Sequence, residues 1–329
     1  MRITKKMRKK IIIPLITVLL LLSSLVMAVT NPVFVYSKEI PDVKVDVERI
    51  KNDVLALCTT SKPRNAKNLD ALNEAAAYIA DEWLKLGLVV DTQAYDVDGK
   101  EYKNLICSFG PEDGERIIVG AHYDVCEEQA GADDNASGTA GILELARLLH
   151  EHQPDLNYRV DLVAYTLEEP PYFRTANMGS AVHAKYLHDN NIPVKAMMCL
   201  EMIGYFSDEK GSQDYPVGLL KLFYPTRGNY ISVVSKFGNG SLTRRVKKGI
   251  KKGSDVEVSS INAPASIPGI DFSDHLNYWK YDYEAVMITN TAFYRNKNYH
   301  EPTDLPDTLD YKRMAEVIKG VYNTVISLD

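Results

Sequence analysis

The chain has 329 residues, of which 45% are hydrophobic and 25% are charged. This balance is that of an ordinary globular protein, and it excludes the collagen-like and intrinsically disordered classes. The formal net charge of −6 argues against nucleic acid as a partner, because proteins that bind nucleic acid present basic faces.

The first 28 residues differ in kind from the rest of the chain. A ten-residue start with six basic side chains precedes nineteen uncharged residues, Ile11 to Val29. This pattern is typical of a secretory signal peptide, and small residues near Ala28 favour cleavage there. The run is also long enough to span a bilayer as an uncleaved anchor. In either case we expect a protein that is secreted or held at the extracellular face, with membrane contact only through this segment if it is uncleaved.

Without residues 1–28 the chain is more acidic, with 32 Lys and Arg against 44 Asp and Glu. The basic run Arg244–Lys252 is the local exception, and we interpret it as the solvated face of one helix. The four cysteines show no zinc-knuckle or CxxC spacing.

Residues 29–41 read as an extended lead-in and residues 42–329 as one domain. Periodic apolar residues predict helices over 46–58 and 68–88. Beyond them we expect strands over 89–97, 102–110, 115–125, 159–169, 194–206 and 284–293, and helices over 137–152, 179–190, 242–253 and 307–328. This alternation predicts an α/β fold with a mostly parallel central sheet and helices on both faces.

Acidic and imidazole side chains gather where these strands end. In open α/β sheets, functional sites form at the carboxyl ends of the strands. The groups at or near those ends are His122, Asp124, Asp133, Asp134, Glu168, Glu169, Glu201 and His300. Each has a simpler interpretation when taken alone, such as a helix cap for Asp133 or Asp134. Together they would be costly to bury without a cation, so the sequence predicts a metal site.

The segments that carry these residues resemble a known family. Five short segments are similar, in the same chain order, to the five ligand motifs of the secreted dinuclear zinc aminopeptidases. These segments are AHYD, GADDNASG, LEE, LEM and YHEPTD. These enzymes are relatives of bacterial leucyl aminopeptidase and glutamate carboxypeptidase II. The resemblance covers roughly residues 65–329, and GADDNASG is its most specific part. It implies a single-domain zinc-exopeptidase fold, two Zn²⁺ per chain and a peptide substrate.

The resemblance also assigns the metal ligands. Asp134 would bridge the two zinc ions. His122 and Glu201 would complete one ion, and Glu169 and His300 the other.

Two further residues receive roles that do not involve binding metal. Asp124 would orient His122 from behind, and Glu168 would act as general base on the water shared by the ions. The family also implies a cis peptide bond between Asp134 and Asn135.

The sequence departs from the family pattern in three places. Glu201 stands where many members have Asp, and Ile270 stands where some members have an assisting tyrosine. The segment EEPPYFRTANMGS is longer than the usual connection, and we expect this inserted loop to shape the substrate pocket.

The leading hypothesis is therefore a zinc-dependent exopeptidase, and within that class an aminopeptidase. One alternative is a glutaminyl cyclase-like acyl transferase, which uses the same fold with one zinc. Another is a carboxypeptidase or amidohydrolase, in which Arg174 or Arg295 could form an ion pair with a substrate carboxylate. A binding module that has lost catalysis is disfavoured, because all five ligand positions and the base are filled. His275 could lie near the site without binding metal.

Overall fold

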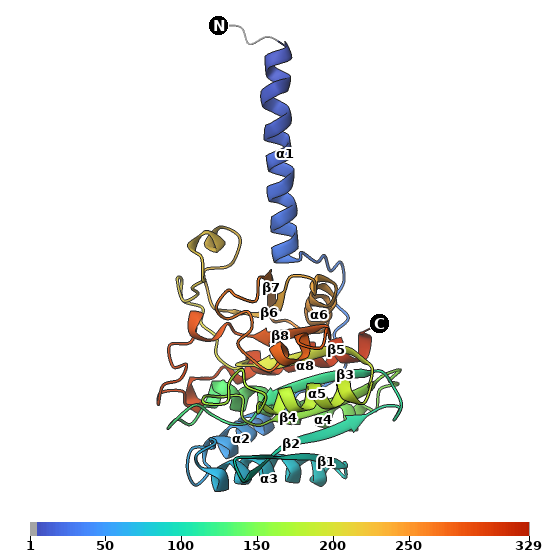
Figure 1. The fold of residues 1–329 in the computed structure, drawn as a ribbon, viewed down its shortest axis with the longest axis vertical. Helices are drawn as coiled ribbons and strands as arrows, with labels where there is room; N and C mark the ends of the chain where they lie inside the picture. The colour runs from blue at the N-terminus through green and yellow to red at the C-terminus, as the bar shows by residue number, and fades with distance from the viewer. Residues whose placement is uncertain (1–4, 329) are drawn as a thin grey trace.

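An eight-stranded sheet in the order β1-β2-β4-β3-β5-β8-β6-β7 organises the protein, as a computed structural model shows (Figure 1). The structure describes residues 5–328, with side chains from residue 13 onward. The strands are β1 Val90–Val97, β2 Lys100–Phe109, β3 Arg116–His122, β4 Arg159–Tyr165, β5 Val194–Glu201, β6 Tyr230–Lys236, β7 Glu257–Ala263 and β8 Ala285–Thr289.

The centre of the sheet is parallel. β3 pairs in parallel with both β4 and β5, and β5 pairs in parallel with β8. Their residues are almost entirely buried, as expected for strands covered on both faces. Because these four strands run the same way, their carboxyl ends meet at one edge, where the predicted site residues lie.

Helices cover both faces of this sheet. The helices are α1 Lys5–Thr30, α2 Val47–Cys58, α3 Leu69–Lys85, α4 Gly138–His152, α5 Gly179–Asp189, α6 Gly240–Gly253, α7 His275–Trp279 and α8 Tyr311–Ser327. Side chains of α2, α3, α4, α6 and α8 form the larger hydrophobic core, and those of α5 and α7 form the core on the other face. The predicted α/β class with helices on both faces is confirmed.

The structure adds elements that the sequence pattern did not predict. β6, β7 and α7 were missed, and so were the kinked turn η1 (Ala132–Ser137), in which Asp134 and Asn135 have non-helical backbone angles, and the short 3-10 turns η2 Gly218–Leu222, η3 Ala292–Tyr294 and η4 Pro306–Thr308. The sheet is more mixed than expected, because β2 pairs antiparallel with β1 and β4, and β6 pairs antiparallel with β8. The predicted extended lead-in at 29–41 is wrong at its start, since α1 continues through Thr30.

The N-terminal helix α1 projects away from the domain (Figure 1). Its segment Ile13–Thr30 is long and apolar enough to cross a membrane, by length and composition. The four cysteines lie in the described part of the chain and form no disulfide there.

Candidate metal centre

His122 is the last residue of β3 and is buried beneath the carboxyl edge of the sheet. Its Nε2 atom lies 3.4 Å from Asp134 Oδ1 and 3.3 Å from Glu201 Oε2. On the other side of the ring, Nδ1 lies 3.4 Å from Asp124 Oδ1 and 3.2 Å from the Asp124 carbonyl oxygen. The imidazole is therefore held from behind while Nε2 faces the carboxylates.

Asp134 lies in η1, where the chain turns sharply before α4. The backbone N–H groups of Asp133 and Asp134 both donate to the Asp304 carboxylate, which ties this turn to the segment after β8. The peptide bond between Asp134 and Asn135 is cis, as the family resemblance predicted. The Asn135 side chain donates to the Leu200 carbonyl, so the turn is also fixed to the end of β5.

Glu168 and Glu169 follow β4, and a single carboxylate holds their backbones. The N–H of Glu168 donates to Asp124 Oδ1 at 3.1 Å, and the N–H of Glu169 donates to Asp124 Oδ2 at 3.0 Å. Their side chains then diverge. Glu169 Oε2 lies 3.4 Å from His300 Nε2, whereas Glu168 Oε2 lies 3.9 Å from His122 Nε2.

Glu201 ends β5 and is oriented by two polar neighbours. The Ser273 hydroxyl donates to Glu201 Oε2 at 2.6 Å, and Asn135 Nδ2 lies 3.4 Å from the same oxygen. The contact of Ser273 with Glu201 could not be read from the sequence, because the two residues are far apart along the chain.

His300 approaches from the opposite side, after β8. Its Nε2 atom lies 3.2 Å from Asp134 Oδ2, and its ring stacks on Tyr299 with centroids 3.8 Å apart. Asp134 thus stands between His122 and His300, with one oxygen facing each.

The chemistry of these groups suits a metal ion. Three sets of three side chains place potential ligand atoms within 4.8 Å of one another: His122 with Asp134 and Glu201, His122 with Glu168 and Glu169, and Cys126 with Glu169 and His300. His122 Nε2, Asp134 Oδ2 and Glu169 Oε1 are buried and have no hydrogen-bond partner. Buried polar atoms without partners are expensive, and a cation would satisfy all three.

The electrostatics of the cluster lead to the same conclusion. Burial raises the pKa of Glu169 to about 7, and repulsion from Asp134 adds to the effect. Burial also raises the pKa of Glu168 far above its usual range, with Glu169 and Glu201 contributing and His122 opposing. Although burial alone would raise the pKa of Asp134, the neighbouring imidazoles of His122 and His300 hold it below its usual value. So many buried carboxylates are stable together only beside positive charge.

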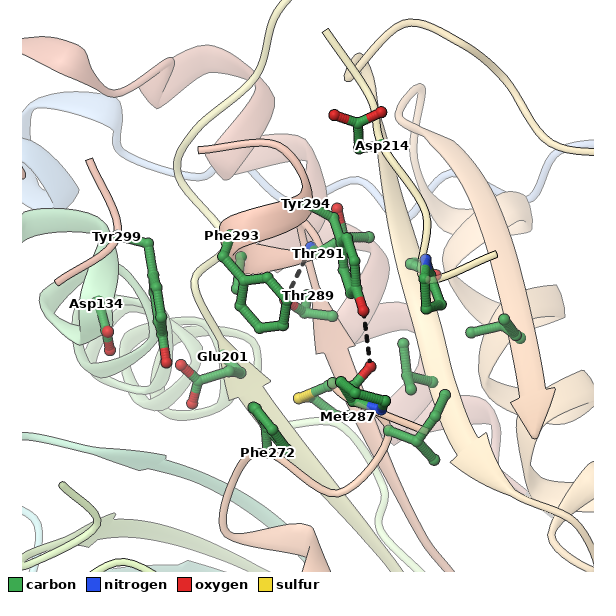
Figure 2. A pocket seen from close by; sticks show the side chains of 18 of the residues that line it. Asp134, Glu201, Asp214, Phe272, Met287, Thr289, Thr291, Phe293, Tyr294 and Tyr299 are labelled. Atoms are coloured by element: carbon green, nitrogen blue, oxygen red, sulfur yellow. Dashed lines mark hydrogen bonds between the residues drawn. The ribbon is translucent and has the colours of Figure 1, made fainter. Parts of the chain in front are cut away.

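A cavity of about 230 Å³ opens over these groups. Figure 2 shows Asp134, Glu201 and Tyr299 at one end, Phe293, Tyr294 and Phe272 beyond them, and Asp214 farther along. The inserted loop after Glu169 contributes Pro170 and Phe173 to the wall, as the sequence predicted. The other apolar lining residues include Val234, Ile261, Ile270 and Met287.

Three residues considered in the sequence stand outside the cavity. Arg174 forms an ion pair with Asp271, and Arg295 is buried and donates to Gln213 and to the Tyr230 carbonyl. His275 is buried, bonds to the Ile270 carbonyl oxygen and packs edge-on against Trp279. Among the described residues that line the cavity there is no Lys or Arg.

Sequence reasoning missed several residues that build the site. Asp304 lies in the YHEPTD motif but was given no role, although it accepts three hydrogen bonds from the η1 turn. Tyr299 could have drawn attention as an aromatic residue next to a candidate ligand. Cys126 follows Asp124 by two residues, and only the fold brings it beside Glu169 and His300.

Comparison with known sequences identifies a family. Residues 104–325 match the model of peptidase family M28. The chain is 49% identical to the uncharacterized protein YfbL of Escherichia coli, over 83% of this chain and 86% of that protein. It is also 26% identical to leucine aminopeptidase 1 of Ajellomyces capsulatus, over 68% of this chain and 56% of that protein, so it spans about half the length of the fungal enzyme.

Solved structures share the fold at lower identity. LapA aminopeptidase of Legionella pneumophila superposes with a TM-score of 0.69 at 21% identity, over 86% of this chain and 72% of that one. A glutaminyl cyclase of Bacteroides thetaiotaomicron superposes with a TM-score of 0.64 at 19% identity, over 88% of this chain and 99% of that one.

Proposed function

Because the chain belongs to peptidase family M28, we propose that it is a zinc-dependent aminopeptidase that removes large apolar residues from the free N-terminus of peptides. The observation that carries this proposal is the arrangement around Asp134. One of its oxygens faces His122 and the other faces His300, while Glu168 stands close by without a histidine contact shorter than 3.9 Å.

The residues present fit two zinc ions. His122, Asp134 and Glu201 would hold one ion, and Asp134, Glu169 and His300 the other, with Asp134 shared. When bound, such a pair of ions supplies Lewis acidity, which polarises the scissile carbonyl and makes a nearby water more acidic. Asp124 fixes the orientation of His122 and so keeps Nε2 available as a ligand.

Glu168 is the group that would move protons. It is buried at the cavity floor and lines the cavity, while its neighbour Glu169 turns toward His300. Glu168 would take a proton from the attacking water and deliver it to the leaving amine as the peptide bond breaks. A base that is not tied to a cation can perform both transfers, whereas a metal-holding carboxylate cannot.

The cavity explains why we favour an amino-terminal substrate. Its floor carries Asp134, Glu168, Glu169 and Glu201, and no Lys or Arg lies among its described lining residues. Carboxylate oxygens that are not bound to metal would accept hydrogen bonds from the ammonium group of a free N-terminus, and these lining residues offer no cationic side chain to pair with a C-terminal carboxylate. The carboxypeptidase alternative is disfavoured, because it requires an arginine to bind the substrate carboxylate. Arg174 is paired with Asp271, and Arg295 donates to Gln213 and to the Tyr230 carbonyl.

The wall of the cavity supports the side-chain preference. Phe173, Phe272, Phe293 and Met287 surround the space beyond the carboxylates. An apolar pocket of this kind favours substrates that bury a large side chain such as Leu or Phe, and disfavours charged ones.

A glutaminyl cyclase-like acyl transferase is the second candidate, because a solved glutaminyl cyclase shares the fold over 88% of this chain. Metal content separates the two candidates. One zinc per chain in protein purified without chelator would favour the cyclase, and two would favour the peptidase.

A panel of chromogenic aminoacyl anilides tests the proposal. We expect Leu and Phe anilides with a free amine to be cleaved at least about tenfold faster than Asp or Lys anilides. N-acetylated Leu anilide should resist cleavage, and a zinc chelator should stop the reaction until zinc is restored. Cleavage of the acetylated substrate alone would exclude an aminopeptidase.

A further inference from the structure

The end of α1 is built into the folded domain. The Thr30 carbonyl accepts hydrogen bonds from Lys247 Nζ at 3.0 Å and from the Ser260 hydroxyl at 2.8 Å. Asn31 is 1% exposed, and its side-chain oxygen accepts from Arg244. α6 and β7 thus hold the chain directly after the apolar span, which is where a flexible linker to the domain would otherwise begin.

A second apolar feature lies in the connection between β5 and β6. Val217, Leu219, Leu222 and Phe223 surround the short turn η2, and each is between half and three-quarters exposed. We call residues 217–223 the apolar loop. Exposed apolar side chains are ordinary when scattered, but four large ones within seven residues mark a contact surface.

One residue links the base of the apolar loop to the end of α1. Ser260 of β7 connects them, because its hydroxyl bonds to Thr30 and its carbonyl accepts from the Tyr224 hydroxyl at the base of the loop. Figure 1 shows the short gold helix of this loop close to the domain end of α1, on the face from which α1 projects. The two apolar features therefore share one side of the molecule.

We propose that α1 is retained as a membrane span and that the apolar loop lies in the interface of the same bilayer. The 18-residue segment Ile13–Thr30 is about 27 Å long as a helix, close to the ~30 Å of a hydrocarbon core. Thr30 then lies at the boundary opposite the basic N-terminus, and the apolar loop lies at the same level.

In this arrangement the cavity lies close to the membrane surface. The residues on either side of the apolar loop, Asp214, Tyr215, Pro216 and Tyr224, line the cavity, whereas Leu219, Leu222 and Phe223 do not. Resting on the proposed aminopeptidase function, the inference is that the preferred substrates are peptides held at the membrane surface. Such peptides reach the cavity mouth by diffusing in two dimensions.

The membrane contact is tested on the full chain in lipid vesicles. Leu222 is 75% exposed and Val89, beside the opposite edge strand β1, is 77% exposed, so Leu222→Trp and Val89→Trp form a matched pair. The native Trp83 and Trp279 are buried and provide a constant background. Lipids brominated near the headgroup should quench the added emission of Leu222→Trp at least about twofold more than that of Val89→Trp.

Two results would overturn the membrane contact. Equal quenching of the two variants would place the apolar loop in water, and a blue shift without bromine quenching would place it against protein, such as a second copy. Intact-mass measurement of the membrane fraction decides retention. A chain beginning at Met1 is expected, and one beginning near Val29 would refute the anchor.

The substrate inference is tested with Leu219→Ser, Leu222→Ser and Phe223→Ser combined. On vesicles, this variant should cleave a lipid-tethered peptide about tenfold more slowly than the parent and a soluble dipeptide equally fast. Equal rates on both substrates would refute the membrane preference. If the parent cleaves neither substrate, the proposed function fails, while the quenching result still decides the membrane contact.

Discussion

Asp124 is the residue on which the geometry of the site converges. One of its oxygens accepts the N–H of Glu168 and lies near His122 Nδ1, and the other accepts the N–H of Glu169. A single carboxylate thus orients an imidazole and fixes the backbone of two adjacent glutamates. This explains how neighbours in sequence can take different roles, because their backbones are clamped while their side chains diverge.

Replacing Asp124 with Asn tests this reading. In asparagine one of the two carboxylate oxygens becomes an NH₂ group, so one of the two backbone N–H donors loses its acceptor and the hold on His122 weakens. Zinc affinity should therefore fall roughly 10- to 100-fold. Competition with a chromogenic chelator measures that affinity. Asp53→Asn is the control, since Asp53 is a buried carboxylate paired with Arg147. If both variants bind zinc equally well, Asp124 has no orienting role.

At the scale of elements, Arg64 holds the connection between β3 and η1 in place. The buried guanidinium donates to the carbonyls of Leu57, Tyr123, Ala130 and Gly131. These carbonyls belong to the end of α2 and to the loop that carries Asp124 and leads to Asp134. One side chain far from the cavity in sequence therefore supports the shape of the metal-binding turn.

Arg64→Met should destabilise the protein strongly. Four buried carbonyls lose their donor, at a cost of roughly 3–5 kcal/mol, and the melting temperature should fall by about 10 °C. Thermal unfolding in detergent micelles measures the shift. Arg313→Met removes a partly exposed arginine that pairs with Asp208, and it should change the melting temperature by only a few degrees. Similar shifts for both variants would contradict the supporting role.

The elements that the sequence predicted are those with strong local patterns. Continuous apolar runs predicted β3, β4, β5 and β8, and helical periodicity predicted α2 to α6 and α8. β7 was missed because it is an edge strand that carries Ser259, Ser260 and Asn262. The residues that contact Ser260 of β7 are Thr30, at the end of α1, and Tyr224, and both are distant from β7 in sequence.

At the scale of the whole molecule, parallel strands explain why the site could be predicted. Residues at the ends of β3, β4 and β5 must meet at one edge, so His122, Glu168 and Glu201 were brought together by topology alone. The assignment of each as ligand or base stays a prediction. Ser273, Tyr299 and Cys126 were not predicted as part of the site, because their positions depend on loops whose paths no local pattern specifies.

The contacts at the end of α1 favour a retained membrane span over a cleaved signal peptide. Sequence pattern alone favoured cleavage near Ala28, yet α1 runs past that point and Thr30 is bonded to β7 and α6. In the proposed arrangement the retained α1 and the apolar loop meet one bilayer, and residues that flank the loop line the cavity. The orientation of the active site toward the membrane would be set by this docking and not by a flexible linker.

The most direct test of the account compares Glu168→Gln with Glu169→Gln by activity and by metal content. Glu168→Gln should keep the parental zinc content while its kcat/KM on Leu anilide falls about a thousandfold, because only the proton-transferring group is lost. Glu169→Gln should lose zinc together with activity. Near-parental turnover by a fully metal-loaded Glu168→Gln would contradict the central claim that this side chain is the general base of a metallopeptidase.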